Sequence, residues 1–176
     1  LMTIHYLSKA CMPYTIVRPH NVYGPNMGFE HVIPQITGKL YERVARAGTS
    51  KKVSIEIQGT GDETRSFIFI TDAVRAIELC TLHDGSSGIY HIGTEHEVSI
   101  KELVHLIGEV LGIEVETVPT LVREGSTSRR CPDTAKISAL GFKPDVPLMR
   151  GLIETVRWYW NYYSHKNGSQ SKAAAH

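Results

Sequence analysis

The stretch YTIVRPHNVYGP, residues 14–25, decides how this chain is interpreted. Residues 14–17 form a short, mostly β-branched run, which is typical of a buried strand. Residues 18–28 then contain two prolines, two asparagines and two glycines, which predict a loop with specific turns. In an open α/β sheet, a polar loop that follows a strand lies at the edge where ligands bind.

Asn21 is the first candidate binding residue in this loop. Its side-chain amide can both donate and accept hydrogen bonds, which suits a sugar hydroxyl or a phosphate oxygen. The alternative is a turn asparagine whose side chain bonds its own local backbone. The residue type alone is compatible with both interpretations.

A second candidate stretch is GTGDETRSF, residues 59–67. Its two glycines either let the backbone approach a ligand closely or simply make a turn. Arg65 stands just before an apolar strand, where its guanidinium could hold a diphosphate through two parallel hydrogen bonds. The alternative is a salt bridge from Arg65 to Asp62, Glu63 or Asp72.

The third candidate stretch is the long polar loop over residues 120–132, which contains Arg123, Arg129 and Arg130. In a chain of formal net charge +1, these arginines make a local positive site that suits two diphosphate charges. The alternative is a solvated basic loop. Nucleic acid is a poor competitor, because the cluster is small and has no interleaved aromatic residues for base stacking.

The order of the elements predicts an α/β design, because strands alternate with helices. The end of a helix is expected over residues 1–11, and full helices over residues 31–47, 71–82, 99–111, 133–140 and 147–163. Strands are expected over residues 14–17, 52–57, 67–70, 89–92 and 114–118. Ser99 is expected to cap its helix, with Glu102 completing a capping box. The sheet that these few strands join is expected to need further sequence.

Composition narrows the classes of function. With 41% hydrophobic and 21% charged residues, the chain is typical of a globular protein, and its small net charge favours neither nucleic acid nor an anionic membrane. No stretch approaches the ~20 apolar residues that span a bilayer. Three cysteines without CxxC spacing indicate free thiols in a reducing, cytoplasmic compartment. Nine histidines without HxxxH or HExxH spacing predict no metal site.

Six stretches in a fixed order resemble the C-terminal half of extended short-chain dehydrogenases/reductases, the NAD-dependent nucleotide-sugar epimerases, dehydratases and decarboxylases. They are RPHNVYGP, HVIP, GTGDETRSFIFITDAVRAI, IYHIGTEHEVSIKEL, SRRCPDTAKI with ALGFKP, and GLIETVRWY, and together they cover residues 13–159. The resemblance implies the C-terminal part of a Rossmann-like fold with a small substrate-binding subdomain. It divides the chain into a remnant of the NAD-binding domain (1–28), a mainly substrate-binding part with returning strands and helices (29–165), and a disordered tail resembling a vector remnant (166–176).

The same resemblance implies roles for individual residues. Pro19 would line the NAD site, and Asn21 would hold the diphosphate of a nucleotide-diphospho-sugar substrate. The nucleotide base would be contacted by Val32, Ile33 and Pro34, partly through backbone, with Gln58 nearby. Arg65 and Arg123 would grip the diphosphate, assisted by Arg129 or, in our assignment, Arg130. His91 replaces an asparagine often found in its strand, and no functional conclusion follows from it.

The family's chemistry needs two features that are not found in this sequence. A tyrosine and a lysine four residues apart move protons while the sugar gives hydride to NAD. The segment YLSK, residues 6–9, has a spacing of three and lies too close to the strand at residue 14. No glycine-rich dinucleotide loop stands between a strand and a helix. We therefore expect no catalytic residue in this chain, an inactive chain by itself, and a longer or partner-completed native protein.

Three hypotheses follow. The first is the substrate half of an epimerase or dehydratase, which would be a homodimer when complete. The second is a non-catalytic binding or regulatory module, and the third is an unrelated small α/β domain whose motif matches arise by chance. The first hypothesis makes one geometric demand, namely that Asn21, Arg65 and Arg123 converge on one pocket shaped for two linked phosphates.

Overall fold

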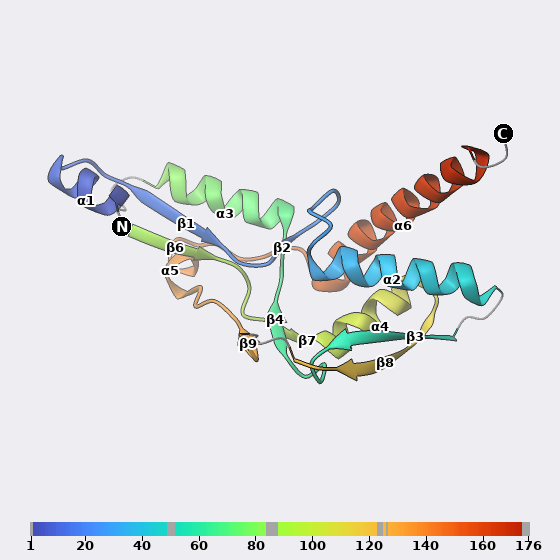
Figure 1. The fold of residues 1–176 in the computed structure, drawn as a ribbon. Helices are drawn as coiled ribbons and strands as arrows, with labels where there is room; N and C mark the ends of the chain where they lie inside the picture. Colours follow the sequence, from blue (N-terminus) through green and yellow to red (C-terminus); the bar gives the residue numbers. More distant parts are fainter. Residues whose placement is uncertain (1, 49–51, 84–87, 123–124, 126, 174–176) are drawn as a thin grey trace. The chain divides into compact units, whose positions relative to one another are not determined.

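The computed structural model describes residues 2–48, 52–83, 88–122, 125 and 127–173, with side chains as far as residue 166 (Figure 1). The chain forms two compact units. Unit 1 comprises residues 1–22, 66–97 and 131–146, and unit 2 comprises residues 23–65, 98–130 and 147–176. The chain passes between the units within the strands β2 (Val22–Tyr23), β4 (Thr64–Ser66) and β7 (Glu97–Ser99), and again after residues 130 and 146. Each unit is described by itself.

Unit 1 is built on two parallel strands, β1 (Thr15–Pro19) and β6 (Gly88–Ile92). Helix α3 (Ile70–Leu82) packs along both strands, and the short helix α5 (Ala135–Ser138) packs against β6 (Figure 1). Helix α1 (Met2–Lys9) precedes β1, and β5 (Ile68–Phe69) leads directly into α3. The apolar core of this unit consists of Ile68, Ala73, Ala76, Cys80, Tyr90, Ile92, Ile137 and Phe142.

The N-terminus of α3 differs from the sequence prediction. The helix begins at Ile70, and Asp72 is not its cap but a buried residue of its first turn. The carboxylate of Asp72 accepts hydrogen bonds from the backbone amides of Asp145 (3.0 Å) and Val146 (2.9 Å) and pairs with Arg75 at 2.9 Å. Asp72 therefore fastens the end of the segment 131–146 to α3.

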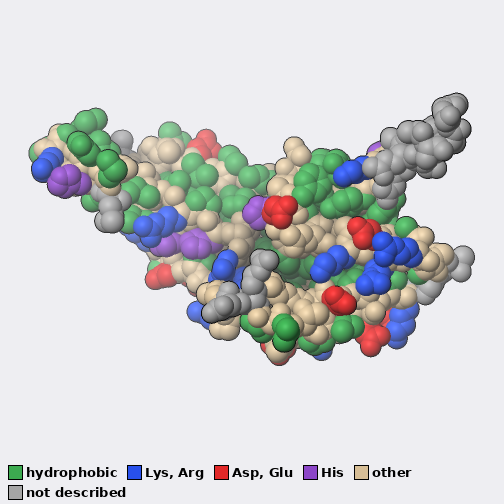
Figure 2. All heavy atoms as spheres, in the orientation of Figure 1, with side chains coloured by type: hydrophobic (Ala, Val, Ile, Leu, Met, Phe, Trp, Pro, Cys, Tyr) green, Lys and Arg blue, Asp and Glu red, His purple; other side chains and the backbone are tan. Residues whose placement is uncertain are grey.

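Apolar side chains remain exposed on the helices of unit 1. Figure 2 shows hydrophobic atoms at the surface over α1 and α3, where Met2, Tyr6, Val74 and Leu82 are each more than half exposed. Residues 15–17 of β1 are half-buried, and Met12 is exposed in the segment that precedes this strand.

Unit 2 also contains a parallel pair, β3 (Lys52–Gln58) and β8 (Glu114–Thr120). Every second side chain of β3 is buried, as the alternation of the sequence predicts. The strands are covered by α2 (Val32–Ala47) and α4 (Ile100–Leu111), and α6 (Leu148–Ala173) packs against both helices (Figure 1). The Ser99 hydroxyl accepts a hydrogen bond from the amide of Glu102 at 3.1 Å, so the predicted cap of α4 is confirmed.

Aromatic residues fasten α6 to the segment that precedes α2. The Tyr159 hydroxyl donates to the carbonyl of Met27. The rings of Phe29 and Tyr159 are nearly perpendicular, and their centroids are 5.4 Å apart. Burial, followed by the neighbouring Tyr163, raises the pKa of Tyr159 to about 12, so it stays a neutral donor. Helix α6 continues to Ala173, into the range 166–176 for which the sequence predicts a disordered tail.

Candidate functional site

Asn21 lies in the sharp loop that follows β1 in unit 1. Its backbone is in the left-handed region, with φ of 42°, a conformation that asparagine tolerates better than most residues. Its Nδ2 donates to the carbonyl of Ser66 at 2.8 Å, and its own carbonyl accepts from the amide of Ile68 at 3.4 Å. The Asn21 side chain thus bonds a strand 45 residues further along the chain rather than its own turn, which fixes the loop in place.

Pro19 is exposed at the carboxyl end of β1, where it is in register with Ile92 of β6. The next residue, His20, continues the pairing, because its amide donates to the carbonyl of Ile92 at 2.8 Å. The predicted cofactor residue and the predicted diphosphate residue therefore stand two positions apart at the same edge of unit 1.

Arg65 of unit 2 is held by backbone carbonyls. Its Nη1 donates to the carbonyls of Thr64 (2.7 Å) and Ser128 (3.3 Å), and its Nη2 donates to that of Thr127 (2.8 Å). Of the three alternative acids, Asp62, Glu63 and Asp72, the last two are otherwise engaged, since Asp72 pairs with Arg75 and Glu63 accepts from backbone amides. Within the described residues no carboxylate lies within ion-pair distance of Arg65, so the proposed salt bridge is not formed there.

A second arginine stands opposite Arg65. Strand β9 (Arg129–Arg130) runs parallel to β4, and the register places Arg130 across from Arg65. Partial burial and then the charge of Arg130 lower the pKa of the Arg65 guanidinium, and Glu63 opposes this shift. An arginine side chain is not deprotonated in proteins. Two like charges in register disfavour each other, and a bound anion would relieve that repulsion.

The glycine-rich stretch before Arg65, residues 59–61, forms a turn. Gly59 and Gly61 have positive φ angles of 81° and 90°. The carboxylate of Glu63 accepts from the amides of Thr60 (3.2 Å) and Gly61 (3.0 Å), and a Cβ on Gly59 would collide with it. The amides that a ligand phosphate could have used are therefore bonded to the chain's own carboxylate.

The residues predicted near a nucleotide base lie at the N-terminus of α2 and at the end of β3. Val32 is half-buried, Ile33 is fully buried and Pro34 is buried. The Ile33 carbonyl accepts from the Thr37 hydroxyl at 2.8 Å, and the Pro34 carbonyl accepts from the Tyr163 hydroxyl at 3.3 Å. Gln58 is exposed and in register with Thr120. A buried Ile33 side chain leaves only backbone for a ligand, so the role of these residues in base binding stays a prediction.

The structure brings together part of the predicted site. Arg65 and Arg130 are partners in one sheet of unit 2. In unit 1, Pro19 ends β1 and Asn21 lies in the loop that follows. Arg123 lies outside the described residues. The sequence did not identify Ser66 as the anchor of Asn21, nor the carbonyls of Thr127 and Ser128 as those that orient Arg65, because backbone acceptors leave no residue-type signal. The contact between His20 and His91 was also missed, although His91 stood out as an unusual residue in its strand.

Parallel strand pairs covered by helices, with a polar loop at the carboxyl end of β1, define a Rossmann-like α/β protein of the extended short-chain dehydrogenase/reductase class. The family model for the NAD dependent epimerase/dehydratase family matches residues 2–93. The chain belongs to this family. In the described residues no helix is long and apolar enough to cross a membrane, and no cluster of three metal-binding side chains is present.

Sequence relatives and solved structures agree with this assignment. The dTDP-D-glucose 4,6-dehydratase of Bos taurus is 36% identical over 175 residues, covering 94% of this chain and 46% of that protein. The GDP-L-fucose synthase 1 of Arabidopsis thaliana is 33% identical, covering 86% of this chain and 49% of that protein. The chain therefore spans about half the length of the relatives it matches.

Two solved structures illustrate the likeness of the fold. The UDP-glucose 4-epimerase of Thermotoga maritima, solved with UDP-glucose, superposes with a TM-score of 0.78 at 26% identity, covering 92% of this chain and 51% of that one. The UDP-glucuronic acid 4-epimerase of Bacillus cereus, solved with UDP-glucuronic acid and NAD, has a TM-score of 0.78 at 21% identity. It covers 90% of this chain and 49% of that one, and it bears on the fold alone.

Proposed function

We propose that the chain is the nucleotide-diphospho-sugar-binding half of an NAD-dependent sugar epimerase or dehydratase. The observation that carries this proposal is the Arg65–Arg130 pair, in which Arg65 is oriented by backbone carbonyls and has no carboxylate partner among the described residues. A guanidinium held in this way is preorganised for an anion with two acceptor oxygens. The names of the relatives, which act on GDP-, dTDP- and UDP-sugars, favour a diphosphate as that anion.

Different residues would bind different parts of the substrate and the cofactor. Arg65, Arg123 and Arg130 would neutralise the diphosphate, and Asn21 would contribute to the same ligand from the loop after β1. The nucleotide base would meet the backbone of Val32, Ile33 and Pro34, with Gln58 nearby. Pro19 would border the nicotinamide of NAD, which supplies transient oxidation of the sugar at C4 when it is bound.

We expect the 176-residue chain by itself not to transfer hydride. The tyrosine–lysine pair and the glycine-rich loop that the family resemblance demands are not found in its sequence. The complete protein would bind NAD, act on the sugar, and form a homodimer. Its three cysteines, Cys11, Cys80 and Cys131, form no disulfide and suit the reducing conditions of the cytoplasm, where we place the protein.

The experiment is an activity assay of the complete protein, with its N-terminal half, against UDP-, dTDP-, GDP- and CDP-sugars in the presence of NAD, read by mass spectrometry. We expect one nucleotide class to be converted, either to an isomer of unchanged mass separated by chromatography or to a product that has lost water. The 176-residue chain alone is the matched control and should convert none. A complete protein that retains no NAD and converts none of these sugars would instead support the non-catalytic module.

A further inference from the structure

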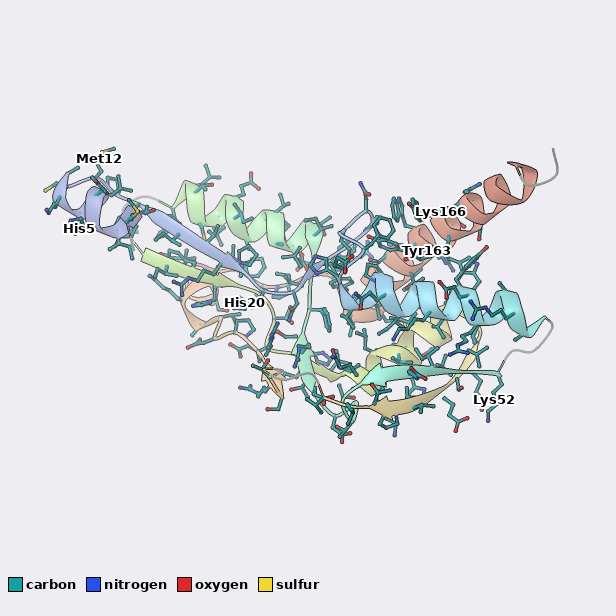
Figure 3. All side chains as sticks on the ribbon, in the orientation of Figure 1. His5, Met12, His20, Lys52, Tyr163 and Lys166 are labelled. Carbon is teal, nitrogen blue, oxygen red and sulfur yellow. The ribbon has the colours of Figure 1, made fainter. Side chains whose placement is uncertain are left out.

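Two histidines from neighbouring strands meet at the carboxyl end of the parallel pair in unit 1. The Nε2 of His20 lies 2.7 Å from the Nδ1 of His91, and the ring centroids are 5.0 Å apart. His20 is labelled where β1 ends in Figure 3. The strand register, with Arg18 opposite His91, and the bond from the His20 amide to Ile92 set this separation. The bond between the rings is thus built into the pairing of β1 with β6.

The bond between the two rings holds one proton. A neutral imidazole has one donor and one acceptor nitrogen, so a neutral or singly charged pair can form the bond. A doubly charged pair would set two N–H groups and two positive charges against each other at this distance. The second proton must therefore break the contact.

Among the described residues, the charged groups acting on His20 are His91 from β6 and Arg18 from β1, and neither is negative. The Cβ of His20 lies beside Gly93. Burial, His91 and Arg18, in that order, lower the pKa of His20 below its ordinary value. The described part of unit 1 thus favours an uncharged His20.

The conformation of His20 is connected to that of Asn21, the next residue. Asn21 holds a left-handed φ of 42°, and its bonds to Ser66 and Ile68 fix the loop from the other side. A ring contact at His20 therefore fixes the start of the turn that these bonds complete.

We propose that His20 and His91 form a proton-sensitive latch that holds the Asn21 loop against β6 and opens when the pair takes up its second proton. The unfolded chain binds more protons than the folded chain between the lowered pKa of His20 and its ordinary value of about 6.5. The stabilisation by the latch is therefore complete above about pH 6.5 and is lost as the pH falls through the lowered value. If Asn21 contacts the diphosphate, ligand affinity would fall in the same range, and this consequence alone rests on the proposed function.

The test is an NMR titration of the His20 imidazole nitrogens in the complete protein between about pH 5 and pH 8. We expect the midpoint of His20 to lie below its ordinary value while the contact with His91 is present. Hydrogen exchange of the Ile68 amide, corrected for its intrinsic pH dependence, should accelerate on the order of tenfold in acid as the loop opens. A His20 midpoint that is not lowered, or Ile68 exchange that does not follow the protonation of His20, would overturn the latch.

Two variants sharpen this test. In His91→Asn the midpoint of His20 should rise, because one cause of its lowered pKa is removed. His105→Gln, which removes an exposed histidine of α4, should leave the titration of His20 unchanged. Neither readout involves a ligand, so the latch can fail while the proposed function stands. Binding of UDP, dTDP and GDP to the complete protein at both ends of the pH range tests the consequence separately, and an affinity equally pH-dependent in wild type and His91→Asn would contradict it.

Discussion

Two arginines of the same chain, Arg75 in unit 1 and Arg65 in unit 2, are used in opposite ways. Arg75 bonds two carboxylates, those of Asp72 at 2.9 Å and Asp145 at 2.5 Å, so its charge is neutralised within the fold. Within the part of the chain that the structure describes, Arg65 bonds only carbonyls, and it is paired in register with another arginine across two strands. The comparison teaches that the partners of an arginine, rather than its presence in a motif, distinguish a structural charge from a ligand-binding one.

The largest loss of stability is expected when Asp72, the buried carboxylate that pairs with Arg75, is removed. Asp72→Ala removes an acceptor that is 1% exposed and leaves the amides of Asp145 and Val146 unpaired. Loss of a buried, fully bonded carboxylate should lower the free energy of unfolding by about 3 kcal/mol. Urea denaturation measures this change, with the exposed Asp62→Ala as control. Equal stability of the two variants would contradict the conclusion that Asp72 holds the end of the segment 131–146 against α3.

Arg65→Ala should affect binding rather than folding. Loss of a charge-assisted clamp should weaken binding of the nucleotide-diphospho-sugar by about 2 kcal/mol, or roughly 30-fold. Calorimetry on the complete protein measures the affinity, and Arg46→Ala, an exposed arginine of α2, is the control. NAD affinity should be unchanged in both variants. If instead NAD binding fell and sugar binding held, the assignment of Arg65 would be wrong.

The complementary change is Arg75→Ala, which should affect folding rather than binding. Its side chain is 46% exposed, so water screens part of the interaction with Asp72, and Asp72 keeps its two backbone donors. We expect a loss of about 1.5 kcal/mol in the free energy of unfolding. The affinity for the nucleotide-diphospho-sugar should match wild type. A binding defect as large as that of Arg65→Ala would erase the distinction between the two arginines.

The smallest loss of stability is expected from Ser99→Ala, which weakens the N-terminus of α4, the helix that contacts the turn before Arg65. The first amides of α4, those of Ile100 and Lys101, donate to the carbonyls of Glu63 and Gly61. Loss of the Ser99 cap should cost about 1 kcal/mol of stability, measured by thermal unfolding against the exposed Ser138→Ala. Affinity for the sugar should change little, because the carbonyls that orient Arg65 belong to other residues.

Local patterns in the sequence predicted much of the fold. The alternation of β3 and the Ser99 cap were confirmed because each depends on neighbouring residues and on periodicity. The sequence places Thr71 or Asp72 before an apolar helix, which suggests a helix cap. The backbone amides that Asp72 binds instead lie more than 70 residues further along the chain. Contacts between such distant residues leave no local pattern.

The candidate site, like the fold, could be predicted from the sequence only in part. Arg65 was identified from its odd position before an apolar strand, yet the sequence could not decide between an ion pair and a ligand. Within the described residues the structure shows backbone carbonyls in place of an ion pair, and those of Thr127 and Ser128 lie 62 and 63 residues away. The ligand role of Arg65 stays a prediction. The His20–His91 contact spans 71 residues and follows from the register of β1 with β6, which no single stretch encodes.

The most direct measurement is a crystal structure of the complete protein bound to its nucleotide-diphospho-sugar. We predict that the two phosphates accept hydrogen bonds of about 2.7–3.2 Å from Arg65 and Arg130, and that Asn21 and Arg123 reach the same ligand. Phosphates bound elsewhere, with Arg65 and Arg130 facing solvent, would contradict the account.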